Sequence, residues 1–457
     1  MKREKFGSRL GFILISAGCA IGLGNVWRFP TMVGENGGAA FVLIYLAFLV
    51  IFGLPIMTME FAVGRASQKS ISESFKALEK KGTKWHLFGY VGMMGNYLLM
   101  MFYTMVTGWM ISYLIKMARG DFSGLNPEAV AGKFDSMVSN PIELTVFMVI
   151  AVAVGFLICS LGLKKGVEKI TKVMMLALLG IIIFLAVISV MQPGAGEGVK
   201  YYLIPDFAKM KEQGISKVIF AALGQAFFTL SIGMGSMAIF GSYIDKDRKL
   251  FGESLSIAIL DTFVALMSGL IIIPACFAFG VGLDSGPSLI FTTLPNIFNK
   301  MGDWGQVFGT FFFVFMIFAA MSTLIAVFEN INSCCEDIWG WSRKKCCLIN
   351  FFAIIILSMP CILGFNVLAG FTPFGPDSNI MDLEDFIISN NILPLGSIIY
   401  VVFCTNKKYG WGWDNFMEEA NTGKGISYPK ALKIYSKYVL PIILLVFWVQ
   451  GIITKFI

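Results

Sequence analysis

Long apolar runs separated by short polar loops dominate the chain. Many of these runs hold about 20 residues or more, the length at which a helix crosses roughly 30 Å of hydrocarbon. The pattern predicts an all-α polytopic membrane protein with about eleven transmembrane helices, several of them long enough to require a tilt. The predicted spans cover residues 10–33, 39–64, 87–117, 141–162, 166–191, 214–243, 254–283, 305–340, 345–370, 380–403 and 431–455.

Composition supports this prediction. Hydrophobic residues make up 56% of the chain and charged residues only 14%, whereas soluble domains carry roughly 25% charged residues. A signal peptide is the alternative for the basic N-terminus, but the apolar run there continues to Arg28 without a small-residue cleavage site. The net charge of +7 is modest and requires no nucleic-acid partner. We expect the lipid bilayer to be the main surrounding, and the protein to be a monomer or a weak homo-oligomer.

Basic residues gather in alternate loops, which sets the expected orientation. The positive-inside rule places the N-terminus, with Lys2, Arg3 and Lys5, in the cytoplasm. Counting crossings from there puts every strongly basic loop on the cytoplasmic side. We expect the protein to lie in the cell membrane of a bacterium. These loops are residues 76–84, 164–165, 245–249, 343–345 and 406–410. Residues 287–302 are apolar but short and proline-bounded, so we expect an external re-entrant or loop helix there.

The sequence gives little support for a metal site or for redox chemistry. The chain has one histidine, His86, and nine cysteines. Two cysteine doublets, at 334–335 and 346–347, flank a basic loop, and their spacing suits neither a zinc site nor a haem. We expect these cysteines to be reduced and structural.

Two predicted spans share a glycine-interrupted pattern, "AIGLGNVWRF" at 20–29 and "SIGMGSMAIF" at 231–240. Paired interruptions in corresponding halves point to the inverted repeat and midplane site of a transporter. Chance is the alternative, since the chain holds 48 glycines. The expected division is a cytoplasmic N-terminal segment at 1–9, repeats at 10–191 and 214–403, and an added span at 431–455.

Broken helices leave backbone groups unpaired in a medium without water, unless a ligand or cavity satisfies them. Free carbonyls can coordinate a hard cation, and the helix N-termini can hold an anionic group. The breaks therefore predict a carboxylate-bearing substrate bound together with an alkali cation. Asp261 supports this because an acid in mid-span is costly, although an acid near a helix end can reach the headgroups. Other oxygen-bearing side chains within the spans are those of Asn25, Thr229, Ser322 and Thr323.

Four longer motifs carry a resemblance to a known family. "RLGFILISAGCAIGLGNVWRFP", "ENGGAAF", "GQAFFTLSIGMG" and "FAAMSTLIAVFENI" resemble the neurotransmitter:sodium symporter family, over essentially the whole chain. The resemblance is greatest to the bacterial branch that carries hydrophobic and aromatic amino acids. It implies a LeuT-type 5+5 inverted repeat, with helices 1 and 6 broken at the midplane.

The resemblance also implies two sodium sites. The first would use the carbonyl of Ala20, the side chains of Asn25, Thr229 and Asp261, and the substrate carboxylate. The second would use the carbonyls of Gly18, Ile21 and Ala319 and the hydroxyls of Ser322 and Thr323. Chloride is not expected, because Asp261 would supply the negative charge permanently. A further hypothesis is that Asp261 takes a proton on the empty return step, since an unpaired buried carboxylate prefers to be neutral.

The implied substrate site surrounds the two breaks. Its α-carboxylate would meet the N–H groups near Leu23 and Gly24 and the Tyr103 hydroxyl. Its α-ammonium would face the carbonyls of Ala20, Phe228 and Ser231. The remaining implied contacts are Gly22, Leu99, Thr229, Met234, Thr323, Leu324 and Val327. Monoamine carriers of this family place an aspartate at the position of Gly22, so glycine favours an amino acid, and the flexible Met234 favours hydrophobic side chains.

The implied gates lie on either side of this site. The outer gate would be Arg28 and Asp385, with Tyr103, Phe228 and Gln225 over the substrate. The inner gate would be Arg3 and Asp337, supported by Phe6, Ser242 and Tyr243. One departure concerns span 5, where many relatives have a proline that helps the helix to unwind. Here that position is Leu176, so unwinding would have to start at Gly166.

Together these features predict a symporter that imports one hydrophobic L-amino acid with about two sodium ions by alternating access. An enzyme is disfavoured, because no Ser/His/Asp set, metal cluster or phosphate loop is evident in the sequence. Two alternatives remain: a symporter of another small amino acid, amine or osmolyte, and an amino-acid sensor that does not transport.

Overall fold

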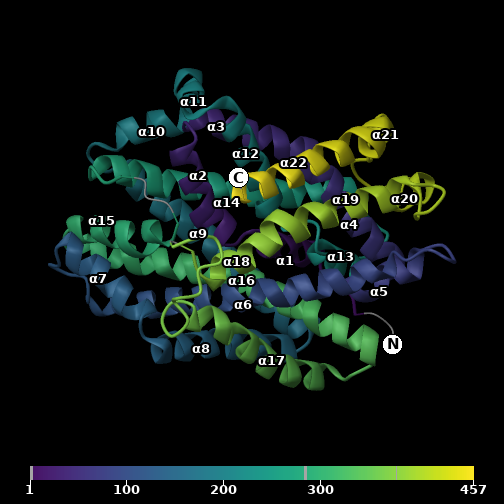
Figure 1. The fold of residues 1–457 in the computed structure, drawn as a ribbon, viewed down its shortest axis with the longest axis horizontal. Coiled ribbons are helices and arrows are strands. Elements are labelled where there is room, and N and C mark those ends of the chain that lie inside the picture. The colour runs from purple at the N-terminus through teal and green to yellow at the C-terminus, as the bar shows by residue number, and fades with distance from the viewer. Residues whose placement is uncertain (1–3, 283–285, 377, 457) are drawn as a thin grey trace.

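The computed structural model describes residues 4–282, 286–376 and 378–456, and every regular element in those residues is a helix (Figure 1). The elements are α-helices, joined in places by single π-helical turns labelled η. The first half contains α1 (Arg9–Ala20), η1 (Gly24–Arg28), α2 (Phe29–Glu35), α3 (Ala39–Phe48), η2 (Leu49–Gly53), α4 (Leu54–Ser67), α5 (Ile71–Leu78), α6 (His86–Arg119), α7 (Pro127–Val138), α8 (Pro141–Ser160), η3 (Leu163–Glu168), α9 (Lys169–Val190), α10 (Ala195–Leu203) and α11 (Phe207–Gln213). The second half contains α12 (Ile215–Thr229), α13 (Ser236–Ser242), α14 (Leu250–Ala278), η4 (Leu289–Thr293), α15 (Leu294–Lys300), α16 (Asp303–Trp339), α17 (Arg343–Leu363), α18 (Ile380–Ile387), η5 (Ile388–Ile392), α19 (Leu393–Thr405), α20 (Trp413–Ala420), α21 (Leu432–Ile434), η6 (Tyr435–Val439) and α22 (Leu440–Phe456).

The described helices match the predicted spans. Nine are long and apolar enough to cross a membrane, and α1 with η1–α2 forms a tenth as a pair bent by 59°. The sixth predicted span consists of α12 and α13, which have 15 and 7 residues, so neither crosses alone. The prediction of a multi-pass protein with broken first and sixth helices is confirmed.

The backbone leaves the helical conformation at both breaks. After α1 the chain becomes extended at Ile21, with ψ of 96°. After α12 the chain takes positive φ at Ser231, Gly233 and Gly235, a conformation that glycine adopts readily and other residues rarely. A Cβ on Gly233 would lie 2.2 Å from the carbonyl oxygen of Leu393, so α19 leaves no room for a side chain there.

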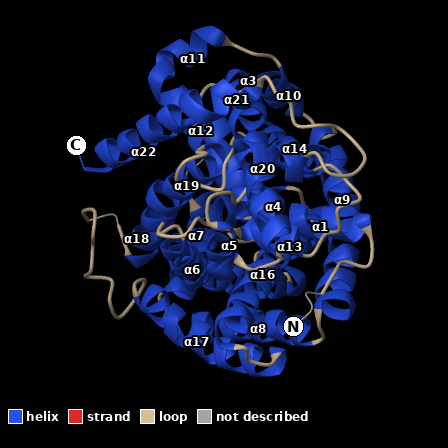
Figure 2. Cartoon of the chain, turned by 90° about the vertical axis from the view of Figure 1, so that its right-hand side faces the viewer, coloured by secondary structure: helices blue, strands red, loops and turns tan. Residues whose placement is uncertain are grey.

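The two breaks meet at the centre of the bundle. α1 packs against α14, α16 and α9, while α13 packs against α4. The start of the described chain, α5 and α20 lie at one end of the molecule, and α7, α10 and α15 lie at the other (Figure 1). Figure 2 faces the first of these ends. The segment predicted as a loop helix, 287–302, contains η4 and α15.

Candidate functional site

A buried carboxylate without a cationic partner lies where α14 passes the two breaks. Asn25 Nδ2 donates to Asp261 Oδ1 at 2.8 Å and to the Asp261 carbonyl at 3.1 Å. Thr229 Oγ1 donates to Asp261 Oδ2 at 3.0 Å, and all three residues are fully buried. No lysine or arginine of the described chain pairs with Asp261. Because a buried charge needs compensation, this set of hard oxygens suits a sodium ion.

A second cluster of oxygens surrounds the hydroxyl of Thr323 on α16. Thr323 Oγ1 lies 3.1 Å from the Gly18 carbonyl oxygen, 3.2 Å from that of Ile21 and 3.5 Å from that of Ala319. Ser322 Oγ donates to the same Ala319 carbonyl at 2.9 Å. One hydroxyl carries a single hydrogen, so it cannot satisfy these carbonyls together. The five residues predicted for the second sodium site are therefore gathered in an arrangement that a cation could complete.

A small cavity of about 30 Å³ lies between the breaks. Ten of the predicted substrate contacts line it: Ala20, Gly22, Leu23, Gly24, Leu99, Tyr103, Phe228, Ser231, Met234 and Thr323. Three predicted contacts do not. Thr229 turns toward Asp261, while Leu324 and Val327 are buried in the helix packing, where Leu324 abuts Gly155 of α8.

Two lining residues, Ile388 and Leu393, come from η5 and α19 and were missed from the sequence. The polar stretch "SNN" at 389–391, followed by a proline inside an otherwise apolar span, is the signal that could have indicated this third irregular helix.

The Tyr103 hydroxyl is an unsatisfied polar group at this cavity. It is buried and has no hydrogen-bond partner within the described residues. A Cβ on Gly22 would lie 2.6 Å from Tyr103 Oη and 2.8 Å from Thr323 Oγ1, so the hydroxyl lies directly beside the first break. An unpartnered donor in this position, beside the first break, suits the carboxylate of a ligand.

A second cavity, of about 190 Å³, adjoins the first and is lined in part by the predicted outer-gate residues Arg28 and Asp385. Leu23 and Phe228 line both cavities and thus separate them. The Arg28 guanidinium carbon stands 4.4 Å above the centre of the Phe228 ring.

The predicted outer-gate residues are only partly in contact. Arg28 and Asp385 line the same cavity but form no ion pair in the described structure, and Asp385 Oδ1 instead accepts from Ser389 Oγ at 2.7 Å. Tyr103 lines only the inner cavity, and Gln225 Nε2 donates to the Gly24 carbonyl at 2.8 Å.

The predicted inner-gate residues lie at the N-terminal end of the molecule. The Phe6 N–H donates to the Tyr243 carbonyl at 3.2 Å, and their rings are 5.6 Å apart. Asp337 accepts from the Ser70 N–H at 2.7 Å and lies 3.5 Å from Lys69 Nζ. Ser242 Oγ donates to the Ile239 carbonyl. Arg3 lies outside the described residues, so its predicted pairing with Asp337 stays a prediction.

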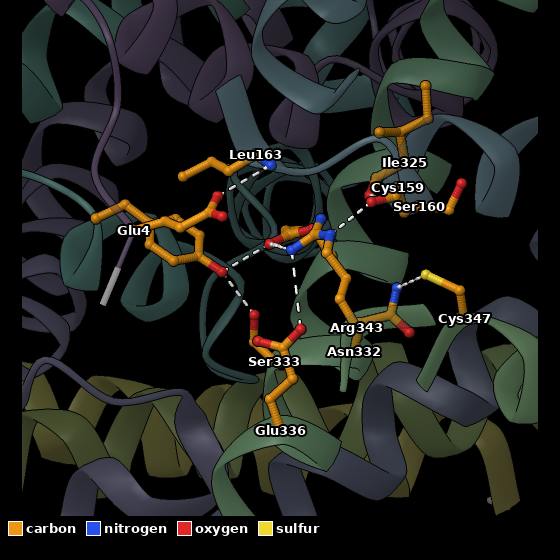
Figure 3. A network of polar contacts seen from close by, with 12 residues as sticks. Glu4, Cys159, Ser160, Leu163, Ile325, Asn332, Ser333, Glu336, Arg343 and Cys347 are labelled. Carbon is orange, nitrogen blue, oxygen red and sulfur yellow. Dashed lines mark hydrogen bonds and ion pairs between the residues drawn. The ribbon is translucent and has the colours of Figure 1, made fainter. Parts of the chain in front are cut away.

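Sequence reasoning missed a buried ion pair at the same end (Figure 3). Arg343 of α17 donates through both terminal nitrogens to the Glu329 carboxylate, whose side chain is 0% exposed. Arg343 Nε also donates to the Cys159 carbonyl at 2.6 Å, and Tyr243 Oη donates to Glu329 at 2.7 Å. The signal was an acid, Glu329, within the predicted span 305–340.

A second missed acid is Glu60 of α4, which is fully buried. Its carboxylate accepts from the N–H groups of Gly233 and of Met237, the latter at 3.2 Å. It therefore satisfies backbone donors that the second break leaves free.

Known proteins of one family are similar to this chain over almost its full length. The model of the sodium:neurotransmitter symporter family matches residues 3–123 and 129–456. An uncharacterized sodium-dependent transporter of Haemophilus influenzae is 32% identical over 99% of this chain and 98% of its own. The uncharacterized sodium-dependent transporter YhdH of Bacillus subtilis is 34% identical over 88% of this chain and 87% of its own. The crystal structure of MhsT in complex with L-phenylalanine matches with a TM-score of 0.87 and 36% identity, covering 98% of this chain and 100% of MhsT.

Proposed function

The chain belongs to the sodium:neurotransmitter symporter family, and from this premise we propose that it imports a hydrophobic L-amino acid together with sodium ions. It is a multi-pass, sodium-dependent membrane transporter, a class distinct from enzymes. The finer proposal concerns the substrate, the number of ions and the orientation, with the N-terminus in the cytoplasm.

The single observation that carries the substrate class is the crowding at Gly22. A side chain there would approach Tyr103 Oη and Thr323 Oγ1 to less than 3.0 Å, and no acidic residue of the described chain lines the cavity itself. A substrate with its own carboxylate fits, because the unpartnered Tyr103 hydroxyl can donate to it. Leu99, Met234 and Ile388 provide apolar walls for the side chain, and the structural relative MhsT was crystallised with L-phenylalanine.

Two sodium ions fit the two oxygen clusters. A neutral zwitterion carried with two cations moves two charges, which a potential of 100 mV drives with about 4.6 kcal/mol. Since 1.4 kcal/mol is a factor of ten, this supports accumulation by roughly a thousandfold or more. A substrate carboxylate that completes the first cluster would make sodium and substrate raise each other's affinity reciprocally.

The test is uptake into proteoliposomes under an inward sodium gradient. Radiolabelled phenylalanine, leucine, glycine and serotonin would each be offered in sodium chloride, sodium gluconate and potassium chloride. We expect accumulation of phenylalanine and leucine in both sodium salts, and none in potassium. Accumulation of serotonin alone would overturn the substrate class, and sodium-dependent binding without accumulation would favour a sensor.

A further inference from the structure

A groove that faces the lipid lies between the start of α6 and the η5–α19 segment, apart from the cavities described above. Its volume is about 410 Å³, which falls within the usual range of roughly 300–1,000 Å³ for ligand pockets. Leu87 and Val91 of α6 form one wall, and Ile392, Leu395 and Ile399 form the other. Leu87 is 52% exposed and Val91 42% exposed, so the α6 wall of the groove is accessible from outside the protein.

The groove runs from one end of the molecule toward its middle. Lys84 and Trp85 line it near the start of α6, and Asn391 lines it before the start of α19. On the other wall the lining runs from Asn391 to Ile399, which at 1.5 Å per residue is roughly 12 Å of helix. This length accommodates part of an extended acyl chain, whose remainder would continue into the bilayer.

Five lysines lie in the two loops at this end of the groove, and one of them, Lys84, lines it. Lys80, Lys81 and Lys84 precede α6, and Lys407 and Lys408 follow α19. Two hydrogen bonds hold these loops together, from Lys80 Nζ to the Lys407 carbonyl and from the Trp85 indole N–H to the Tyr409 carbonyl.

Acidic side chains neutralise this cluster only in part. Asp414 lies 3.3 Å from Lys407 Nζ, and Glu79 is engaged by His86 Nδ1 at 2.6 Å. The amino groups of Lys81 and Lys84 have no acidic or hydrogen-bonding partner in the described chain. The positive charge at the end of the groove is therefore in excess.

We propose that this groove binds one anionic glycerophospholipid, with an acyl chain along α6 and α19 and the headgroup phosphate at Lys84. Basic pockets between membrane helices on the cytoplasmic side suit anionic headgroups, and a tryptophan at the interface anchors such a position. A neutral lipid would leave the excess positive charge uncompensated. The site is separate from substrate transport, so it does not depend on the proposed function.

The test is native mass spectrometry of the full chain in detergent, titrated with phosphatidylglycerol or with phosphatidylcholine of the same acyl chains. We expect one phosphatidylglycerol to bind at least tenfold more tightly than phosphatidylcholine. The pair K81Q/K84Q should weaken phosphatidylglycerol binding by roughly thirtyfold, and L395W, which fills the groove, should remove binding of both lipids.

Matched controls lie elsewhere on the lipid-facing surface. K164Q/K165Q removes two exposed lysines from η3, and L176W adds the same ring at an exposed position of α9. Both should bind phosphatidylglycerol as the unaltered protein does. Equal affinity for the two lipids, or full binding in both groove variants, would overturn the proposal. Because the lysine pair is exposed, its result remains decisive if L395W fails to fold.

Discussion

At the scale of single residues, the carboxylate of Asp261 determines the electrostatics of the centre. It is fully buried and accepts hydrogen bonds only from neutral donors, Asn25 and Thr229. We predict that Asp261→Asn raises the half-saturating sodium concentration for uptake by about 10- to 100-fold. The reason is that a hydrogen bond or ligand contact to a charged group contributes about 1.5–3 kcal/mol. Uptake measured against sodium concentration in proteoliposomes checks this.

The control for this variant is Asp414→Asn, which removes the same charge from an exposed side chain. It should leave sodium activation unchanged. The unaltered protein should transport equally in sodium chloride and in sodium gluconate, because Asp261 supplies the negative charge. A normal sodium dependence in Asp261→Asn would contradict the role given to this carboxylate.

Gly22 carries the second prediction at this scale. A Cβ there would lie 2.6 Å from Tyr103 Oη and 2.8 Å from Thr323 Oγ1, so both the substrate cavity and the second oxygen cluster must give way. We predict that Gly22→Ala weakens substrate binding at least tenfold, measured by scintillation proximity with labelled phenylalanine. Gly180→Ala is the matched control, since a Cβ at Gly180 meets nothing within 4 Å. Equal affinity in the two variants would refute the argument from crowding.

The sequence predicted most residues of the central cavity, but not the contribution of η5 and α19. The glycine pattern predicted where the helices break, and the position of Asp261 in mid-span predicted that it belongs to the site. Ile388 and Leu393 were not predicted, because the sequence does not show whether an apolar residue of a span faces the cavity, a neighbouring helix or lipid. Val327 was expected in the cavity for the same reason and instead packs within the bundle.

At the scale of elements, the N-terminal segment is fastened to the start of span 5. Glu168, at the end of η3, accepts from the Gly7 N–H at 2.7 Å and from Ser8 Oγ at 3.0 Å. α9 is continuous through Leu176, so the irregular part of this span is η3, which contains Gly166. Opening toward the N-terminal end must therefore separate Glu168 from the segment before α1.

We predict that Glu168→Gln loosens this contact, because an amide offers one acceptor oxygen in place of two. Amide hydrogen exchange in residues 4–12 and 163–175 should accelerate by about tenfold, which corresponds to roughly 1.4 kcal/mol for a hydrogen bond to a charged group. Mass spectrometry of exchange in sodium buffer measures this. Glu197→Gln on the exposed α10 should change nothing, and unaltered exchange in Glu168→Gln would show that this contact does not hold the segment.

The membrane-spanning helices were predictable from the length of their apolar runs. All eleven predicted spans correspond to helices of the described chain, because burial in lipid demands about 20 apolar residues in a row. The π-helical turns were not predicted. A turn such as η2 (Leu49–Gly53) is as apolar as the α-helix around it, so only packing reveals it.

At the scale of the whole molecule, one side chain joins the two halves at the N-terminal end. Arg343 contacts Cys159 of α8, in the first half, and Glu329 of α16, in the second (Figure 3). Tyr243, which directly follows α13, donates to the same Glu329 and is reached by Phe6. The ion pair therefore holds the segments that must part if this end of the molecule is to open.

We predict that Arg343→Met destabilises the protein strongly, because it leaves the carboxylate of Glu329 buried without its cationic partner. Removing one member of a buried pair costs about 3–5 kcal/mol, whereas replacing both members is often nearly neutral. The double variant Glu329→Gln/Arg343→Met should therefore melt at a higher temperature than Arg343→Met alone, so that the two changes are not additive. Lys344→Met, at an exposed neighbouring position, should melt at the same temperature as the unaltered protein.

The double variant also separates folding from transport. If it melts at the temperature of the unaltered protein but no longer transports, the ion pair is needed to close this end of the molecule and not only to fold it. If Arg343→Met alone melts normally, the pair does not hold the two halves together.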